Sequence, residues 1–448
     1  MKKTIIYSIL LICTSCSSIC IDDEMSSTDE YVKKEDIRML ITYGQSLSVG
    51  GLTYSKDNDF YNAISFQGGG SEYAYNVDIN NKESVENYYG EDFINIIDCQ
   101  NGIATPIASL YLSYIKSLNR LWDRDSIKYI FSAPGDVGKS IDYFVKDSYY
   151  YKRLLYSVTK AKEFADKRDA VFSVPVIYWV QGEDNTKIKE GSDNNSSYGY
   201  YLTLKNLFED LNKDIKMITN QYEDVSFITY QQSPVLNVDY QELHYDYGGP
   251  YMAHLKLALE ENNVYMSGPM YQYEYSDIWH PVFRETIGIQ AGLTMQRITG
   301  GGYKCFYINH INYYQEADRW CLDLTFDVPC EPIRFYYPSD GCHNKNGKQP
   351  YCGFSLKDST NNDILIEEPI IINSNTLRLI CNKNPLNCKL SYATDGHFGG
   401  GNLCDSQKFY ITINNRNFLI DNFCVAFQDF IIPYIGNVCK LSILTSCV

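Results

Sequence analysis

Hydrophobic and polar residues alternate in two different patterns between residues 37 and 300. Short apolar runs predict buried strands at residues 37–43, 127–133, 172–180, 224–232 and 264–271. Longer stretches with apolar residues every three or four positions predict helices at residues 105–118, 151–168, 201–218, 251–262 and 283–300. Because strand–helix repeats are typical of a parallel sheet covered by helices on both faces, we predict a doubly wound, three-layer α/β/α fold.

Local signals predict several ends and irregularities of these elements. Thr105 is a suitable cap before Pro106 in the first turn of its helix, and Gly300 is suited to end the last helix. Pro175 lies near the start of the third strand, which predicts either an edge position or a bulge there.

The pattern changes at about residue 303. Short alternating runs, broken by Gly, Asn, Asp and Pro, predict a smaller antiparallel, β-sandwich-like domain. Eleven of the fifteen cysteines lie between Cys305 and Cys447, which places a boundary near residues 300–302. The sequence therefore divides into one domain at residues 36–302 and a Cys-rich domain at residues 303–448. In a secreted chain these cysteines permit disulfides of undetermined pairing, and the lack of Cys-x-x-Cys pairs among them argues against zinc.

The N-terminus, "MKKTIIYSILLICTSCSSIC", predicts a signal peptide at residues 1–21. Its apolar run, Ile5–Ile12, is too short for a permanent transmembrane helix. Cys16 is a candidate for a lipid anchor because "ICTSC" resembles a bacterial lipobox, although Cys13 stands where Leu is usual. Residues 22–35 are polar and acidic, which predicts a tether. We expect a secreted, periplasmic or cell-surface protein without a transmembrane helix once the signal is removed.

Composition narrows the classes of partner. The formal net charge of −16 argues against nucleic acid and anionic membranes, which attract an excess of Lys and Arg. Neutral or weakly charged substrates fit this balance better. The chain has 41 tyrosines, whose flat apolar rings and hydroxyls suit sugar surfaces, although biased coding would produce the same excess.

The stretch "ITYGQSLSVG" at Ile41–Gly50 places Ser46 directly after the first predicted strand. Gly44 allows the backbone to turn sharply there. The stretch is not the Gly-x-Ser-x-Gly elbow, because Ser48 stands where the second glycine would be. Ser46 fits a nucleophile or a simple turn residue, and a nucleophile requires a base from elsewhere in the chain.

His280, in "YSDIWHPVF" after the last predicted strand, is the best candidate for that base. Asp277, three residues earlier, can accept a hydrogen bond from Nδ1–H and leave Nε2 free to take the serine proton. The alternative is that Asp277 caps the turn and His280 packs beside Trp279. His244 has no evident partner, and His254 lies in a predicted helix as an ordinary surface or core residue.

Two stretches after other strands offer donors for an oxyanion. "APGDVGKSI" provides the backbone N–H groups of Gly135 and Gly138, and "YWVQGEDN" provides the amide of Gln181. Each alone also fits a plain loop. Because ligands bind at the carboxyl ends of parallel strands, we expect these groups to lie near Ser46 and His280.

Four blocks together resemble the SGNH hydrolase superfamily, and within it the carbohydrate esterases of the sialate O-acetylesterase (SASA domain) and acetylxylan esterase type. The blocks are Gly44-Gln45-Ser46-Leu47, Gly138-Lys139-Ser140-Ile141, Trp179-Val180-Gln181-Gly182-Glu183 and Asp277-Ile278-Trp279-His280. Their order and approximate spacing agree over residues 37–300, and the third and fourth blocks are the most specific. The resemblance implies a triad of Ser46 as nucleophile, His280 as general base and Asp277 as its orienting group. It implies no metal or cofactor.

The same resemblance implies an oxyanion hole formed by the N–H groups of Ser46 and Gly138 and the amide of Gln181. Gln45 and Glu183 would then support the loops that carry these groups. The late segment "LSYATDGHFGGGNLCDS" also resembles part of some family members, and we interpret it as structural.

Three positions depart from the family pattern. Leu47 replaces the usual Asn, so we expect substrate choice to differ near the nucleophile. Lys139 replaces a glycine and adds a long side chain to the oxyanion loop. Asp184-Asn185 follows Glu183 where the family has a small residue and then Asp, so that acidic position is shifted or lost.

These features predict a secreted serine esterase that removes O-acetyl groups from carbohydrates, such as sialic acid or plant or bacterial glycans, through an acetyl-enzyme. The main alternative is a catalytically degenerate, cell-surface carbohydrate-binding protein on the same fold, which the tyrosines and the changes at Leu47 and Lys139 motivate. A lipase or thioesterase would need a long apolar groove. The sugar, the acetylated position and the oligomeric state are open at this point.

Overall fold

The computed structural model describes residues 34–50, 60, 62–99, 102–118, 127–186, 197–233, 249–276, 280–337, 348–394, 400–433 and 436–437. The predicted signal peptide, Cys16 and all but the last two residues of the predicted tether lie outside these ranges. From Glu35 onward the chain forms one compact unit. None of the described helices is long and apolar enough to cross a membrane.

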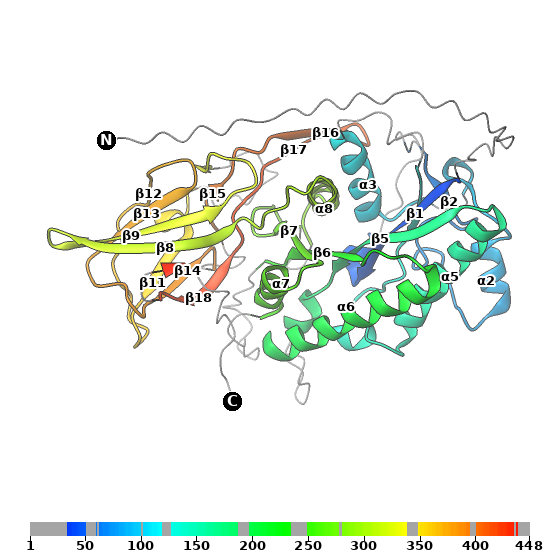
Figure 1. Cartoon of the computed structure of the whole chain (residues 1–448), viewed down its shortest axis with the longest axis horizontal. Coiled ribbons are helices and arrows are strands. Elements are labelled where there is room, and N and C mark those ends of the chain that lie inside the picture. Colours follow the sequence, from blue (N-terminus) through cyan, green and yellow to red (C-terminus); the bar gives the residue numbers. More distant parts are fainter. Residues whose placement is uncertain are drawn as a thin grey trace, which may run out of the picture. The chain divides into compact units, whose positions relative to one another are not determined.

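A five-stranded parallel sheet forms the centre of the N-terminal part (Figure 1). Its strands are β1 (Asp36–Gly44), β4 (Ile127–Ser132), β5 (Val171–Val180), β6 (Ser226–Gln231) and β7 (Val264–Pro269). Their spatial order is β4-β1-β5-β6-β7, and every neighbouring pair is parallel. The chain therefore winds outward from β1 in both directions, which confirms the doubly wound sheet and makes the gap between β1 and β5 its switch point.

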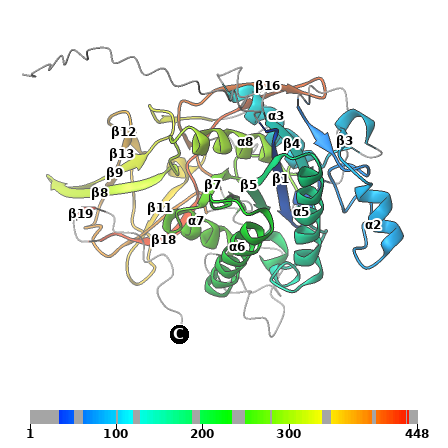
Figure 2. The same cartoon turned by 45° about the vertical axis from the view of Figure 1, so that its right-hand side comes forward.

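Helices cover both faces of this sheet, as predicted (Figure 2). Alternate residues of β1 (Ile37, Met39, Ile41 and Tyr43) pack in one core with α5 (Tyr149–Lys167), α6 (Ser197–Thr219) and α7 (Gly249–Glu260). Leu40 points to the opposite core, which contains α3 (Thr105–Ser117) and α8 (Glu285–Thr299). Because successive side chains of a strand point to opposite faces, a strand that is apolar at nearly every position is buried on both.

One of the two predicted helix caps is confirmed and the other is wrong. Gly300 caps α8, with its N–H donating to Gln296 O, whereas Ala104 rather than Thr105 occupies the N-cap position of α3. Pro175 lies in the centre of the sheet, where the pairing of β1 and β5 shifts register between Arg38/Leu40 and Ser173/Val176. The extra residue on β5 is the predicted bulge, and it accommodates a proline that cannot donate to the ladder.

Several short elements were not predicted. They are α1 (Ser46–Val49), α2 (Lys82–Tyr89), the hairpin of β2 (Ile64–Ser65) and β3 (Ile94–Asn95), and the 3-10 turns η1 (Ile96–Asp98), η2 (Ile141–Tyr143), η3 (Glu183–Thr186) and η5 (Pro350–Gly353). Each is too short to show a period in the sequence.

After residue 303 the chain forms antiparallel strands, which confirms the predicted change of architecture. The strands are β8 (Tyr307–Glu316), β9 (Arg319–Asp327), β10 (Arg334–Phe335), β11 (Phe354–Lys357), β12 (Ile370–Ile371), β13 (Thr376–Cys381), β14 (Lys389–Tyr392), β15 (Leu403–Cys404), β16 (Phe409–Ile413), β17 (Arg416–Ile420), β18 (Phe427–Ile431) and β19 (Gly436–Asn437). The largest sheet has the order β12-β13-β9-β8-β19, and a second has the order β11-β14-β18. All nine cysteines of the described ranges are free thiols.

The later strands also pack on the α/β part. Tyr251, Met252 and Leu255 of α7 share one core with β8, β9 and β13. The hairpin β16–β17 reaches back to α3 and α8 (Figure 1), and its Ile411 and Phe418 are buried in their core. The division of the chain into domains at residues 36–302 and 303–448 stays a prediction.

A bidentate contact joins β6 to the later strands and can be tested. Gln231 is fully buried; its Nε2 donates to Ala426 O and its Oε1 accepts from Ala426 N–H, both over 2.7 Å. We expect Gln231→Ala to lower the free energy of unfolding by about 2–4 kcal/mol, because two buried backbone groups lose their partners.

Urea unfolding measures this loss. Gln221 makes the same kind of clamp, on Val174 of β5, but is half-exposed, so Gln221→Ala is the matched control. We expect a smaller loss there because water replaces the amide. Equal losses would contradict the prediction.

Candidate functional site

The turn after β1 presents Ser46 at the start of α1. Gln45 N–H donates to Val180 O over 2.9 Å, which ties the turn to the end of β5. Gly44 has φ of +136°, and a Cβ there would lie 2.1 Å from Val180 O, so only glycine permits this approach. Ser48 is buried and its Oγ donates to Gln45 O over 2.7 Å. Ser48 therefore closes the turn, whereas Ser46 is half-buried with its hydroxyl directed elsewhere.

Ser46 Oγ lies 2.9 Å from His280 Nε2, although 234 residues separate them in the chain. His280 belongs to a loop closed by two main-chain hydrogen bonds, from Ser276 N–H to His280 O and from Val282 N–H to Glu274 O, both over 2.8 Å. A hydroxyl at this distance from an imidazole nitrogen can transfer its proton to it. The fold thus brings together the predicted nucleophile and the predicted base.

Asp277, Ile278 and Trp279 lie outside the described residues, as does His244. The orienting role of Asp277 therefore stays a prediction.

The loop after β4 lies against the Ser46 turn. A Cβ on Gly135 would lie 2.2 Å from Gly44 O and 2.6 Å from Ser48 Oγ, and Asp136 N–H donates to Gly44 O over 3.1 Å. Gly138 follows in the same loop, is exposed, and has φ of +60° with open space around its Cβ position. Its role as an oxyanion donor stays a prediction.

Two buried charged side chains form hydrogen bonds to the backbone of the loop after β4. Arg153 of α5 donates to Pro134 O over 2.8 and 3.0 Å and also to Gly135 O. Glu72 is fully buried and accepts from Ala133 N–H over 2.9 Å and from the hydroxyl of Ser132. Ala133, Pro134 and Gly135 therefore each have one backbone group hydrogen-bonded to a charged side chain, which gives the loop a defined conformation.

Gln181, directly after β5, is fully buried and its amide is engaged at both ends. Nε2 lies 3.3 Å from Gln45 Oε1, 3.2 Å from Lys139 O and 2.6 Å from Asn185 Oδ1. Oε1 accepts from the hydroxyl of Tyr200 over 2.6 Å. Gln181 therefore connects the Ser46 turn to the Gly138 loop, and its donor role toward an oxyanion stays a prediction.

The neighbouring residues Gln45, Glu183 and Asn185 are also buried. Gln45 Oε1 accepts from Asp184 N–H over 3.2 Å, and Asn185 Oδ1 accepts from Ile141 N–H over 2.9 Å. Glu183 accepts from the hydroxyl of Tyr230 on β6. These contacts hold together the loops that carry the reacting groups.

The departures from the family pattern have structural consequences. Leu47 is 1% exposed and packs in the core with α3, so its side chain supports the turn and does not face a substrate, contrary to our expectation. The ammonium of Lys139 lies 5.1 Å from the ring centroid of Tyr143, which is half-exposed. Asn185, which stands where the resemblance implies an acidic residue, is neutral, and its Oδ1 accepts two hydrogen bonds.

Sequence reasoning missed the buried polar residues Glu72, Arg153 and Tyr200, which support the loops of the site. His254, expected to be an ordinary helix residue, is fully buried with Nε2 3.1 Å from the hydroxyl of Tyr200. For His254 and Arg153, the sequence offered one signal: a polar residue lies at a position of a predicted helix where the period predicts an apolar residue.

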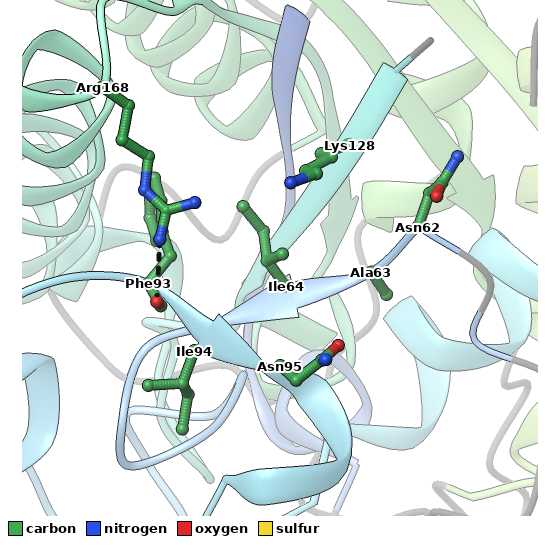
Figure 3. Close-up of a pocket in the computed structure, with 8 residues that line it drawn as sticks. All are labelled: Asn62, Ala63, Ile64, Phe93, Ile94, Asn95, Lys128 and Arg168. Carbon is green, nitrogen blue, oxygen red and sulfur yellow. Dashed lines mark hydrogen bonds between the residues drawn. The ribbon is translucent and has the colours of Figure 1, made fainter. Parts of the chain in front are cut away.

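A hollow of about 350 Å³ lies elsewhere, beside the hairpin β2–β3 (Figure 3). Lys128 and Arg168 line it; Arg168 donates to Phe93 O over 2.9 Å and pairs with Asp92, and Lys128 pairs with Glu35. Lys128 is in register with Ile37 near the start of β1, so this hollow lies at the opposite end of the strand from Ser46. It takes no part in the site.

No protein-family model and no curated protein matches this sequence. Among solved structures, a carbohydrate acetylesterase from Xanthomonas citri is similar with a TM-score of 0.54 at 12% identity, over 88% of this chain and 80% of that chain. A protein from Arabidopsis thaliana has a TM-score of 0.37 at 12% identity, over 60% of this chain and 100% of that chain. A carbohydrate acetylesterase from Sinorhizobium meliloti has a TM-score of 0.31 at 10% identity, over 59% of this chain and 100% of that chain. The likeness to the Xanthomonas protein shows a shared fold, and it confirms the fold that the SGNH resemblance implied.

The buried imidazole of His254 gives a prediction about stability. Burial lowers the pKa of His254 to about 3, whereas an unfolded His titrates near 6.5. Between those pH values His254 is protonated in the unfolded chain and neutral in the folded chain. The free energy of unfolding therefore has its full value above pH 6.5 and decreases as the pH falls. The expected contribution is about 1.4 kcal/mol per pH unit between pH 6.5 and pH 3.

Urea unfolding at pH 7, 6, 5 and 4 compares the wild type with His254→Gln, which has no titrating ring. We expect the free energy of unfolding of the variant to depend less steeply on pH. Parallel curves for the two proteins would contradict a buried neutral His254.

Proposed function

We propose that this protein is a serine esterase that removes acetyl groups from carbohydrates. The observation that carries the proposal is the 2.9 Å contact between Ser46 Oγ and His280 Nε2, placed at the β1/β5 switch point where such sheets bind ligands. The fold shared with the Xanthomonas citri carbohydrate acetylesterase supports an acetylated carbohydrate as the substrate.

The reaction would proceed in two halves. His280 Nε2 takes the hydroxyl proton while Ser46 Oγ attacks the acetyl carbonyl carbon, and the carbonyl oxygen becomes an oxyanion. The N–H groups of Ser46 and Gly138 stabilise this charge, and the enclosed amide of Gln181 holds the two loops that carry these groups. The tetrahedral intermediate then collapses, the protonated His280 returns the proton to the sugar oxygen, and the deacetylated sugar leaves an acetyl group on Ser46.

Water completes the cycle. His280 removes a proton from the water as it attacks the acetyl-enzyme, and it then protonates Ser46 Oγ as acetate departs. Asp277 would accept from Nδ1–H and stabilise the positively charged ring in both halves. We propose a secreted location, in line with the predicted signal peptide, and sialic acid or plant or bacterial glycans as the acetylated substrates.

Substitution of the two reacting residues tests the proposal. We expect Ser46→Ala and His280→Ala each to lower kcat/KM for p-nitrophenyl acetate by at least about 10³-fold, because loss of nucleophile or base removes the covalent route. Ser355→Ala and His310→Ala, in β11 and β8, are matched controls outside the site and should keep wild-type turnover. A purified, folded Ser46→Ala enzyme with wild-type turnover would refute the mechanism.

The second candidate is a carbohydrate-binding protein on a degenerate esterase fold. It is favoured by large exposed tyrosines such as Tyr143, Tyr198 and Tyr222, whose rings could stack on sugars. The two functions differ in one measurement, which is reaction with a serine-directed fluorophosphonate.

We expect stoichiometric labelling of Ser46, located by peptide mass spectrometry, and no labelling of the Ser46→Ala variant. The intact contact with His280 is the physical reason, since it activates the hydroxyl. Glycan binding without any labelling would favour the second candidate.

A further inference from the structure

A chain of buried polar groups extends from α7 to the site. His254 of α7 has Nε2 3.1 Å from the hydroxyl of Tyr200 on α6, and that hydroxyl lies 2.6 Å from Gln181 Oε1. The indole Nε1–H of Trp179 donates to the same hydroxyl over 3.3 Å. His254, Tyr200 and Gln181 are each 0% exposed, so water does not compete for these contacts.

The hydroxyl of Tyr200 has a single proton, and its shortest contact is the one to Gln181 Oε1. That proton is therefore donated to the amide oxygen in preference to the main-chain oxygen of Gln181 at 3.2 Å, and the hydroxyl oxygen accepts from Trp179 Nε1–H, with His254 Nε2 in contact with the same oxygen. Burial raises the pKa of Tyr200 well above its usual value and lowers that of His254 to about 3. Both groups consequently stay neutral over the working pH range, and the pattern of donors does not change with pH.

Three oxygen atoms face the opposite side of the Gln181 amide. Gln45 Oε1, Lys139 O and Asn185 Oδ1 lie 2.6–3.3 Å from Nε2. If the amide were reversed, its oxygen would face three other oxygens and its NH₂ group would face a hydroxyl that already accepts a hydrogen bond from Trp179. The Tyr200 hydroxyl and the three acceptors thus select one amide orientation.

This orientation links two loops. Gln45 precedes Ser46, and Lys139 follows Gly138, so the correctly oriented Gln181 holds the nucleophile turn and the oxyanion loop at a fixed separation. We propose that Tyr200 is a positioning residue for the esterase reaction: its hydroxyl fixes the orientation of the Gln181 amide, and His254 in turn holds Tyr200. This inference rests on the proposed function, because it concerns the same Ser46 site.

Tyr200→Phe is the direct test because it removes one oxygen atom and keeps the ring. We expect kcat for p-nitrophenyl acetate to fall about tenfold with KM nearly unchanged, since donors aimed at the transition state are disturbed while the substrate surface is not. The rate of Ser46 labelling by a fluorophosphonate, which forms a tetrahedral adduct, should fall by a similar factor. The pH profile of kcat/KM should keep its wild-type shape, because Tyr200 and His254 both stay neutral.

Tyr88→Phe is the matched control. Tyr88 is equally buried, but its hydroxyl donates to the backbone carbonyl of Gly69 over 2.8 Å and not to Gln181. Its loss should lower the midpoint of thermal unfolding to a similar extent and leave kcat unchanged. A fall in kcat that is equal in both variants would show a general effect of stability and overturn the proposal.

A double-mutant cycle tests the route through the amide. If Tyr200 acts by orienting Gln181, Tyr200→Phe should have no further effect on kcat in a Gln181→Ala background. Equal effects of Tyr200→Phe in both backgrounds would overturn the proposal. If Tyr200→Phe does not yield folded protein, His254→Leu is used in the same cycle, with a smaller loss of kcat expected and the same dependence on Gln181.

The two hypotheses fail in different ways. Retained activity of Ser46→Ala would remove the proposed function and this inference with it. An inactive Ser46→Ala enzyme, together with wild-type kcat in Tyr200→Phe, would overturn this inference alone.

Discussion

The close approach of β1 and β5 at their carboxyl ends is the constraint on which the rest of the site depends. Gly44 lies so near to Val180 O that no side chain fits, and the next peptide donates to that same carbonyl. The chain must then leave the sheet at once, which places Ser46 at the head of α1 and Gln181 beside it. Gly135 approaches the same turn from the other side, with no room for a Cβ against Gly44 O. Three strand ends therefore converge on one point, and a displacement of any of them would move the others.

Buried polar groups hold this point in place. Glu72 and Arg153 hold the loop after β4, Glu183 is held by Tyr230, and Gln181 is held between Tyr200 and the Gln45 amide. Each of these polar groups would be costly to bury without its partners, so the networks favour one arrangement of the loops. Catalysis by preorganised donors needs such rigidity, because the donors must already point to where charge develops.

The later strands contribute to this arrangement as well. The hairpin β16–β17 packs into the core of α3 and α8, and the guanidinium of Arg416 lies 4.4 Å from the ring centroid of Phe283. Phe283 follows His280 by three residues and also contacts Phe418 edge-on. The antiparallel part is thus connected to the segment that carries the proposed base, in addition to the clamp of Gln231 on Ala426.

The sequence by itself determined the parallel sheet, its covering helices and the change of architecture near residue 303, and it singled out Ser46 and His280 as candidates. It could do so because apolar periods and glycines such as Gly44 are local signals, and because candidates for a nucleophile and a base are recognisable by residue type. Only the tertiary structure decided that Leu47 packs inward and that Gln181 is enclosed. It also decided that four buried polar residues support the loops of the site, namely Tyr200, His254, Glu72 and Arg153. Those roles depend on partners from distant elements, and a hydrogen bond between residues far apart in the chain leaves no periodic trace in either of them.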